Sequence, residues 1–370
     1  MFIPTRDECY ELANNSDVFY VTKTIVNGCE VELYDYRLAT YKDFKENNAY
    51  NMRGIAFVNQ NNTWIPYPAL HKFFNVNENE DWEASKLRSK KIINVQDKRD
   101  GSMISFCKCA GEVFAKSKMS FISEQAKTAQ QIYDNDERVY NFVNWCLSFD
   151  LYPIFELTSP FNQIVLNYCD TKLSLLQLRD KNGEYLPAES LINCHKRFGV
   201  DLAEIQEILD LDDYLQMREY VTGIEGWVIT FDDGTIAKVK TKEYLDKHGV
   251  FSELREDNII RLCVEETIDD VISELNGQKK EFVQNVNDIV TKKFNALVLE
   301  YKDLRYKYFN VFNENRKDFA MMYKNERMFP QLMRTLNTSF RDVEQTAKQC
   351  AKEYILSHTT SLTKAKEFLV

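Results

Sequence analysis

The stretch WVITFDDGTIAKVK, residues 227–240, decides the fold class of the chain. Its first five residues are apolar or β-branched, Asp233-Gly234 is a strong turn signal, and the rest returns with alternating polarity. This pattern predicts an antiparallel β-hairpin. Side chains two apart on a strand point to one face, so Lys238 and Lys240 are expected to project together.

Short β-type runs alternate with turn residues through the part of the chain before this hairpin. They cover residues 54–58, 103–107, 153–157 and 172–178, with helical patches at 123–149 and 202–218 between them. Runs of this length with turns between them predict an α+β domain built on antiparallel sheet, which we assign to residues 1–247.

Breaker residues almost vanish from the C-terminal third. None of the 11 glycines lies beyond Gly277, and only one of the 7 prolines lies beyond Pro187. Apolar residues between 282 and 308 step mostly by three or four, which predicts a helix of about 30 residues. Shorter helices are expected over 340–356 and after residue 361. Residues 248–370 are therefore predicted to form an all-α domain.

The composition of the 370-residue chain excludes several classes of protein. With 44% hydrophobic and 28% charged residues it is neither disordered nor fibrous. No apolar run approaches the ~20 residues of a membrane span, and the N-terminus lacks the pattern of a signal peptide. Nine scattered cysteines beside only four histidines do not form a zinc knuckle. These features predict a cytoplasmic protein with reduced thiols.

The net charge of −10 argues against a nucleic-acid partner only at first sight. Residues 292–370 carry 15 basic and 9 acidic side chains, so this segment is locally basic. Because the local field matters more than the total, a polyanion can bind at the C-terminal end.

Lys98, within Asp97-Lys98-Arg99-Asp100-Gly101, is the candidate nucleophile. It precedes a β-run, and the glycine three residues on lets a backbone or a ligand come close. A lysine reacts as the free amine, which desolvation and nearby cations favour. The alternative is a solvated turn lysine, and on this short segment alone that alternative is the commoner case.

Two further groups of side chains can serve a phosphate-binding pocket. Lys116 and Lys118 repeat the same-face spacing of the hairpin lysines, and such pairs bind phosphate when they face a pocket. Glu156 and Glu225 lie in apolar surroundings, where a carboxylate must be paired or bound to metal. The glycines around Glu225 leave room for a ligand, and its hard oxygens suit Mg²⁺. Each carboxylate can also form a plain structural ion pair.

Several common signatures are missing from the sequence. It contains no Gly-x4-Gly-Lys-[Ser/Thr] loop, no Gly-x-Gly-x-x-Gly, no His-Glu-x-x-His and no Gly-x-Ser-x-Gly. P-loop chemistry, dinucleotide binding and serine hydrolysis are therefore disfavoured.

The order of these features resembles the covalent nucleotidyltransferase superfamily, and within it the phage RNA ligase 1 family. The strings that carry the resemblance run from about residue 31 to 248 and are Met52-Arg53-Gly54-Ile55, Lys72-Phe73-Phe74-Asn75, Asn77-Glu78-Asn79, Lys116-Ser117-Lys118, Ser123-Glu124-Gln125-Ala126, Ile164-Val165-Leu166 and Ile224-Glu225-Gly226. The helical tail has the family's length and character. The resemblance implies an ATP-grasp-like ligase adenylation domain followed by an all-α domain that contacts RNA.

The resemblance also implies a reaction. Lys98 would attack the α-phosphorus of ATP and form lysyl-AMP, the adenylate would pass to an RNA 5′-phosphate, and an RNA 3′-hydroxyl would then close the phosphodiester and release AMP. ATP is thus the expected cosubstrate, with Mg²⁺, or Mn²⁺ in its place, as the metal. Cations and metal at the transferring phosphate should dominate catalysis.

Roles for individual residues follow from the resemblance by position. Catalysis is expected from Lys98, Lys238 and Lys240; nucleotide contacts from Tyr36, Arg53, Lys72, Glu156 and the same three lysines; metal binding from Glu225 and Asp269. Lys118 matches a further family lysine and is ranked below Lys98 as nucleophile. Asp269 has an alternative interpretation as part of an acidic helix face.

The expected partner is RNA, in particular tRNA broken in the anticodon loop of a phage-infected bacterium. Healing of the RNA ends would fall to a separate polynucleotide kinase-phosphatase, because the chain has no P-loop. The alternatives left open are a DNA ligase or a GTP-using capping enzyme, and an RNA-binding module that keeps the pocket without turnover.

Overall fold

The computed structural model describes residues 3–160, 166, 168–247, 254–339 and 342–370. Three small sheets form the first two thirds of the chain. The first has the order β1-β2-β3-β4 and is antiparallel throughout. Its strands are β1 (Phe19–Val26), β2 (Cys29–Tyr36), β3 (Ile55–Gln60) and β4 (Thr63–Tyr67), with α1 (Arg6–Asn14) against β1 and α2 (Tyr41–Glu46) after β2.

The second sheet has the order β11-β10-β9-β7-β8 and carries helices on one face. Its strands are β7 (Ser102–Cys109), β8 (Glu112–Lys116), β9 (Tyr152–Thr158), β10 (Lys172–Arg179) and β11 (Asp201–Leu202); its helices are α4 (Glu124–Asn135), α5 (Glu137–Ser148) and α6 (Ala188–Phe198). Phe106, Phe142 and Phe155 fill the space between helices and strands.

The third sheet has the order β5-β13-β12-β6 and contains the hairpin that the sequence predicts. Its elements are β5 (Phe74–Asn75), β6 (Ile92–Lys98), β12 (Gly226–Phe231) and β13 (Ile236–Lys240), with α3 (Ala84–Leu87), α7 (Leu211–Met217) and α8 (Lys242–Lys247) around it. Trp227 on β12 is 2% exposed and anchors a core shared with α7.

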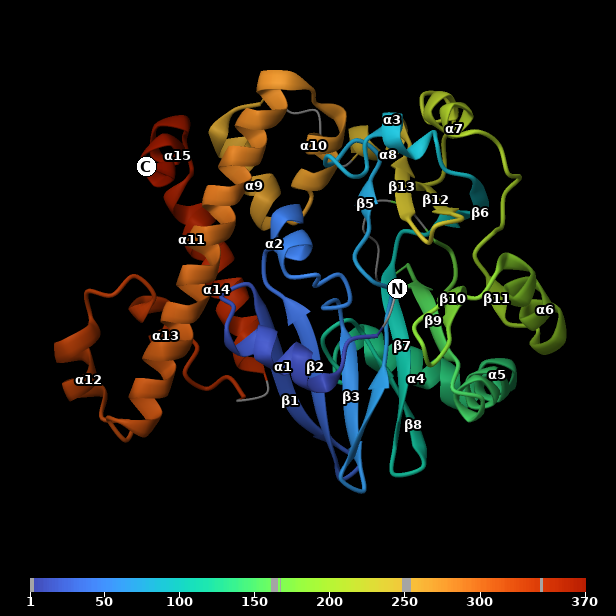
Figure 1. Cartoon of the computed structure of the whole chain (residues 1–370). Coiled ribbons are helices and arrows are strands. Elements are labelled where there is room, and N and C mark those ends of the chain that lie inside the picture. The colour runs from blue at the N-terminus through green and yellow to red at the C-terminus, as the bar shows by residue number, and fades with distance from the viewer. Residues whose placement is uncertain (1–2, 161–165, 167, 248–253, 340–341) are drawn as a thin grey trace.

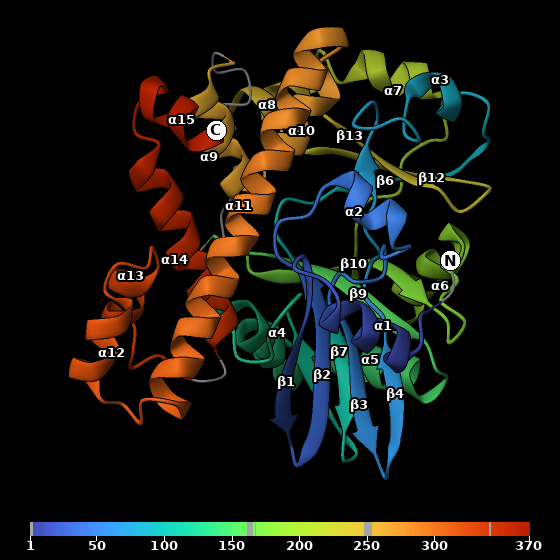
Figure 2. The same ribbon diagram turned by 60° about the vertical axis from the view of Figure 1, so that its left-hand side comes forward.

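Helices make up the described residues from 254 onward. They are α9 (Glu256–Val264), α10 (Ile268–Glu274), α11 (Gly277–Asn310), α12 (Arg316–Tyr323), α13 (Phe329–Arg334), α14 (Val343–His358) and α15 (Leu362–Leu369). The long α11 is the axis of this part, and α9, α13 and α14 pack along it (Figures 1 and 2). Leu38 and Leu245 of the preceding part join this helical core, so it is continuous with the sheet region.

The predicted fold class is confirmed: an α+β region with antiparallel sheets is followed by helices. The long helix over 282–308 is confirmed as α11, which begins at Gly277. The helical patch over 202–218 is wrong in extent, since only Leu211–Met217 is helical. The patch over 123–149 consists of two helices that meet at Asp136. The domain boundary at 247/248 stays a prediction, because residues 248–253 lie outside the described part.

No helix among the described residues combines the length and apolar character that crossing a membrane requires.

Candidate active site

Lys98, Gly226 and Lys240 lie side by side across three strands. In the third sheet β12 is antiparallel to both β6 and β13, and Gly226 pairs with Lys98 on one side and with Lys240 on the other. Residues paired in this way point to one face of a sheet. Lys238 pairs with Val228 two residues along and so shares that face. Three lysines from two segments far apart in sequence therefore converge.

Gly226 makes this convergence possible because it has no side chain. Its φ is +150°, and a Cβ atom at this position would lie 2.0 Å from the carbonyl oxygen of Val239. Any larger residue would push β13 away from β12. The glycine thus keeps β12 close to β13, which carries Lys240.

Glu225 places a buried carboxylate against the amines of Lys98 and Lys240. Its side chain is 3% exposed, and its Oε1 atom lies 2.7 Å from Nζ of Lys98 and 3.4 Å from Nζ of Lys240. Its Oε2 atom is buried and has no hydrogen-bond partner among the described residues. One carboxylate therefore serves two lysines through one oxygen and keeps the other oxygen available.

The short helix α10 places two acidic residues on the hairpin lysines. Asp269 Oδ2 lies 3.2 Å from Nζ of Lys238, and Asp270 Oδ2 lies 2.8 Å from Nζ of Lys240. The side-chain amide of Asn75 on β5 donates to Asp270 at 3.2 Å and to Asp269 at 3.5 Å. The helical region thus closes directly over the sheet that carries the lysines.

Burial and charge act oppositely on the members of this cluster. Burial raises the pKa of Asp269, but Lys238, Lys72 and Lys240 outweigh it, so its pKa falls. Burial dominates at Asp270, whose pKa is raised. Burial also lowers the pKa of Lys238. The pKa of Lys240 is raised, because Asp270 and Glu225 outweigh the effect of burial.

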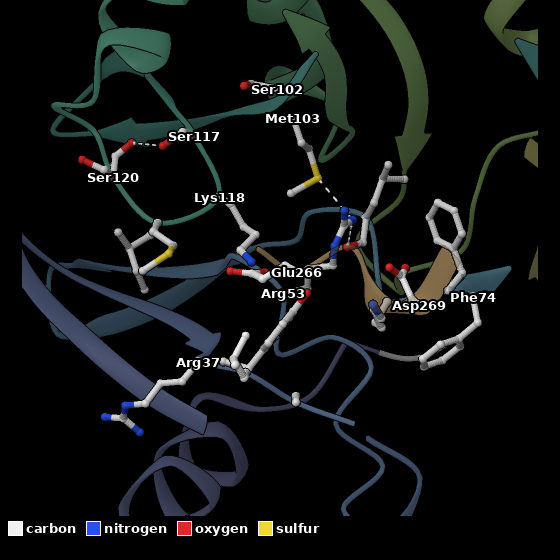
Figure 3. Close-up of a pocket in the computed structure, with 18 of the residues that line it drawn as sticks. Arg37, Arg53, Phe74, Ser102, Met103, Ser117, Lys118, Ser120, Glu266 and Asp269 are labelled. Atoms are coloured by element: carbon white, nitrogen blue, oxygen red, sulfur yellow. Dashed lines mark hydrogen bonds between the residues drawn. The ribbon is translucent and has the colours of Figure 1, made fainter. Parts of the chain in front are cut away.

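A cavity of 1070 Å³ opens over these lysines and runs between the sheets and the helical region. Its lining includes Tyr36, Arg53, Lys72, Lys98, Lys118, Glu156, Lys238, Lys240 and Asp269. In Figure 3 the Lys118 amine lies beside the carboxylate of Glu266, with Arg53 and Asp269 further along the same space. All the residues to which the resemblance assigns a catalytic, nucleotide-binding or metal-binding role line this cavity except Glu225, which is in ionic contact with two that do.

Aromatic rings hold the cations of the cavity in place. The Nζ atom of Lys118 is 4.3 Å from the centre of the Tyr36 ring, and that of Lys72 is 5.1 Å from the centre of the Phe74 ring. Burial raises the pKa of Tyr36, but Lys118, Lys72 and Arg53 outweigh it, so the pKa falls. The wall around Tyr36 is therefore strongly cationic and suited to a polyanion.

Glu156 lies on β9 beside the turn that follows Lys98. A Cβ atom at Gly101 would lie 2.3 Å from the carbonyl oxygen of Leu157 and 3.1 Å from Cγ of Glu156, so only glycine lets the two segments approach this closely. Burial raises the pKa of Glu156 to about 8, against the opposing effect of Lys98. Its carboxyl group can therefore hold a proton at neutral pH and donate a hydrogen bond to a ligand.

Lys116 and Lys118 do not form the same-face pair that their spacing predicts. The strand β8 ends at Lys116, whose side chain is 0% exposed and donates to the carbonyl oxygen of Gly54 at 2.6 Å. Lys118 lies beyond the strand end and reaches the cavity, where it is 3.5 Å from Asp35. Strand periodicity does not extend past the last paired residue, which is why the prediction was wrong.

Sequence reasoning missed Asp270 and Asn75. Adjacent residues on a helix point in different directions, so the sequence offers no reason to expect Asp269 and Asp270 to contact the same hairpin. In the structure Asp269 contacts Lys238 and Asp270 contacts Lys240. Of the string Ile164-Val165-Leu166, the first two residues lie outside the described part of the chain.

The donor set suits one hard divalent cation only in part. Glu225 offers a buried oxygen that no hydrogen bond satisfies, as a metal ligand would. No group of three or more histidine, cysteine, aspartate or glutamate side chains that could hold a metal ion occurs among the described residues. Mg²⁺ commonly takes one or two carboxylates and completes its shell with substrate phosphates and water, which this arrangement permits.

Comparison with known proteins points to one class of enzyme. A family model described as RNA ligase matches residues 51–247. A protein of Thermovibrio ammonificans that carries the provisional name of an RNA ligase is 25% identical over 325 residues, covering 85% of this chain and 84% of that protein.

Two further relatives extend the comparison. A protein of Autographa californica nuclear polyhedrosis virus, provisionally named a bifunctional polynucleotide kinase/RNA ligase, is 23% identical and covers 82% of this chain but 44% of its own length. A solved archaeal ATP-dependent RNA ligase matches 95% of this chain and 77% of its own with a TM-score of 0.50 at 9% identity, which shows a shared fold.

Proposed function

The chain belongs to the phage-type RNA ligase family of the nucleotidyltransferase superfamily, and from this membership we propose that it is an ATP- and Mg²⁺-dependent ligase that joins RNA 5′-phosphate and 3′-hydroxyl ends. The proposed path runs through lysyl-AMP and an RNA-adenylate. The observation that carries the proposal is the row formed by Lys98, Gly226 and Lys240 with Glu225 between the two amines.

Lys98 is the proposed nucleophile of the first step. Its free amine attacks the α-phosphorus of ATP, an N–P bond forms, the bond from the α-phosphorus to the bridging oxygen breaks, and pyrophosphate leaves. In the ligand-free protein Glu225 holds the Lys98 ammonium at 2.7 Å. Lysine attacks phosphorus only as the free amine, so the first step requires that Lys98 is released from this partner.

Lys238 and Lys240 are proposed to bind the phosphates that transfer and leave. Charge grows on the leaving pyrophosphate in the transition state, and cations fixed nearby stabilise it without reorganisation. Both lysines are paired with α10 in this structure. Nucleotide phosphates must therefore replace Asp269 and Asp270 as their partners.

The remaining wall residues are proposed to hold the nucleotide. Arg53, Lys72 and Tyr36 would contact the triphosphate, and Glu156 would contact the ribose; all four line the one cavity. Glu225 would hold Mg²⁺ through its free oxygen, with Asp269 as a second candidate once Lys238 is released. The bound metal would supply charge neutralisation at the phosphates.

The proposed RNA substrate is broken tRNA, repaired in a phage-infected bacterium. The basic segment 292–370 supports a role for the helical region in holding RNA, because counterion release drives such binding. A separate polynucleotide kinase-phosphatase is proposed to act before this chain on the same RNA ends; the name of the viral relative pairs a polynucleotide kinase with an RNA ligase in one protein.

The test is mass spectrometry of purified protein after incubation with ATP or GTP and Mg²⁺. We expect one AMP adduct from ATP, mapped to Lys98 and absent from Lys98→Ala. The matched control Lys91→Ala removes an exposed lysine just before the same strand and should retain the adduct.

Other outcomes would redirect the proposal. An adduct formed only from GTP would identify a capping-type enzyme, and sealing of DNA in preference to RNA would identify a DNA ligase. No adduct on any lysine, with Lys98→Ala indistinguishable from the parent, would leave an RNA-binding module. Comparison of a nicked tRNA with a linear RNA of equal length then tests the substrate.

A further inference from the structure

Helix α14 is docked on the end of strand β2 by a buried ion pair. Nε of Arg37 lies 2.8 Å from Oε1 of Glu344, and the side chains are 3% and 9% exposed. Lys302 of α11 adds a second cation to Glu344 at 2.7 Å. Burying the charges of Arg37 and Glu344 is favourable only when the geometry is fixed, so this contact sets the position of α14 relative to the cavity wall.

Lys348 lies one helical turn beyond Glu344, on the same face of α14. Its amine donates to the backbone carbonyl of Tyr36 at 3.0 Å and contacts the Tyr20 hydroxyl at 3.2 Å. No carboxylate lies within ion-pair distance of it among the described residues. Glu344 thus binds Arg37, and Lys348 binds the preceding residue, Tyr36. Lys348 also lines the cavity.

Lys118 contacts the same tyrosine through its ring. Its amine lies over the Tyr36 ring at 4.3 Å and 3.5 Å from Asp35. Burial lowers the pKa of Lys348 and the Lys118 charge adds to this effect, whereas Asp35, Glu266 and Glu344 oppose it. Lys118 and Lys348 are balanced by the carboxylates of Asp35 and Glu266, so a phosphate that binds both amines must displace Glu266 from Lys118 (Figure 3).

We infer that Lys348 and Lys118 form a phosphate subsite to which the helical region contributes one cation. The inference rests on the proposed function and deepens it: the ligand is a phosphate group, either of the leaving end of the nucleotide or of the 5′ end of the RNA. Both lysines line the cavity next to Tyr36: Lys118 lies over its ring, and Lys348 donates to its backbone carbonyl. A bound phosphate would accept a charge-assisted hydrogen bond from each lysine, and its negative charge would offset the repulsion between the two amines.

The inference gives the helical region a part in the chemistry of the site. Helix α14 is held to the sheet region by Arg37 and Glu344, so the cation at position 348 is placed by that contact and needs no RNA to position it. The subsite therefore exists in the ligand-free protein and can be tested without turnover.

The experiment measures binding by calorimetry with the full chain, in the absence of ATP and metal. One arm titrates inorganic tripolyphosphate, and the other compares an oligoribonucleotide bearing a 5′-phosphate with its 5′-hydroxyl form. Lys348→Met should weaken binding about tenfold in one of the two titrations, the effect expected for one charge-assisted hydrogen bond. The ligand whose affinity falls identifies the source of the phosphate.

Two further variants separate charge from structure. Lys348→Gln removes the charge but keeps a donor for the Tyr36 carbonyl. It should bind phosphate as poorly as Lys348→Met, and it tests the charge independently if the methionine variant folds badly. Lys352→Met, one turn further along α14 and outside the cavity lining, should bind like the parent. Unchanged affinity of a folded Lys348→Gln in both arms would overturn the subsite. Because the readout is binding, it is independent of whether Lys98 becomes adenylated.

Discussion

The Nζ atom of Lys98 lies 2.7 Å from Oε1 of Glu225. The proposed nucleophile is thus held by a buried carboxylate, where the sequence alone suggested a cavity of cations. Lysine attacks phosphorus only as the free amine, so the proposed first step requires that Lys98 leaves this carboxylate. Glu225 is therefore the group whose change of partner should accompany activation.

Glu225→Gln should reduce the rate of adenylate formation by about 10²-fold, as for other removed electrostatic contacts in active sites. The amide keeps the shape and loosens the hold on Lys98, but it removes the charge with which Glu225 would hold Mg²⁺ at the phosphates, and this loss should dominate. The measurement is the rate of AMP incorporation at saturating ATP, with circular dichroism to verify folding. Glu219→Gln, which alters a half-exposed carboxylate paired with Lys242, is the control. A parental rate in a folded Glu225→Gln would remove Glu225 from the mechanism.

Gly226→Ala should destabilise the fold by about 3 kcal/mol, combining left-handed backbone strain with a clash. The new Cβ would lie 2.0 Å from the Val239 carbonyl oxygen. Gly234→Ala is the matched control, because its φ is +83° but nothing lies within 4 Å, and it should cost about 1 kcal/mol. Urea denaturation measures both. Equal losses would mean that the strand spacing at Gly226 tolerates a side chain.

The hairpin and the long helix could be predicted because their signals are local. Asp233-Gly234 between two β-type runs and the apolar stripe of α11 each lie within one short window of sequence. The row that unites Lys98 with Lys240 could not be derived in this way. It depends on the register between β6 and β12. The resemblance implied that Lys98 and Lys240 share a role, but it did not give this register.

The errors at Lys116 and at 202–218 have one cause. Strand or helix periodicity was extended past the residue at which backbone pairing stops. The contact of Asp270 with Lys240 lay beyond any pattern, because it joins two regions through tertiary packing.

Glu156 should make stability fall with rising pH. Burial raises its pKa to about 8 in the folded protein from 4.5 in the unfolded chain, so the folded state holds a proton that the unfolded state has lost. The stabilisation is complete below the unfolded value and is lost as pH rises to about 8. Glu156→Gln should abolish this loss, whereas Glu207→Gln, which changes an exposed carboxylate, should retain it. Urea denaturation across this range is the measurement, and parallel curves for Glu156→Gln and the parent would contradict the assignment.

Asp270→Asn should strengthen ATP binding in the absence of metal by about tenfold. Asp270 pairs with Lys240 at 2.8 Å and is 1% exposed, so phosphate must displace a buried carboxylate to reach that lysine. The asparagine leaves Lys240 without this partner in the free protein, and bound phosphate then compensates the charge. Calorimetry with ATP and EDTA measures the effect, and Asp303→Asn, which alters an exposed pair on α11, is the control. Weaker binding by Asp270→Asn would mean that this carboxylate helps to build the nucleotide site, so that α10 assists the phosphates instead of competing with them.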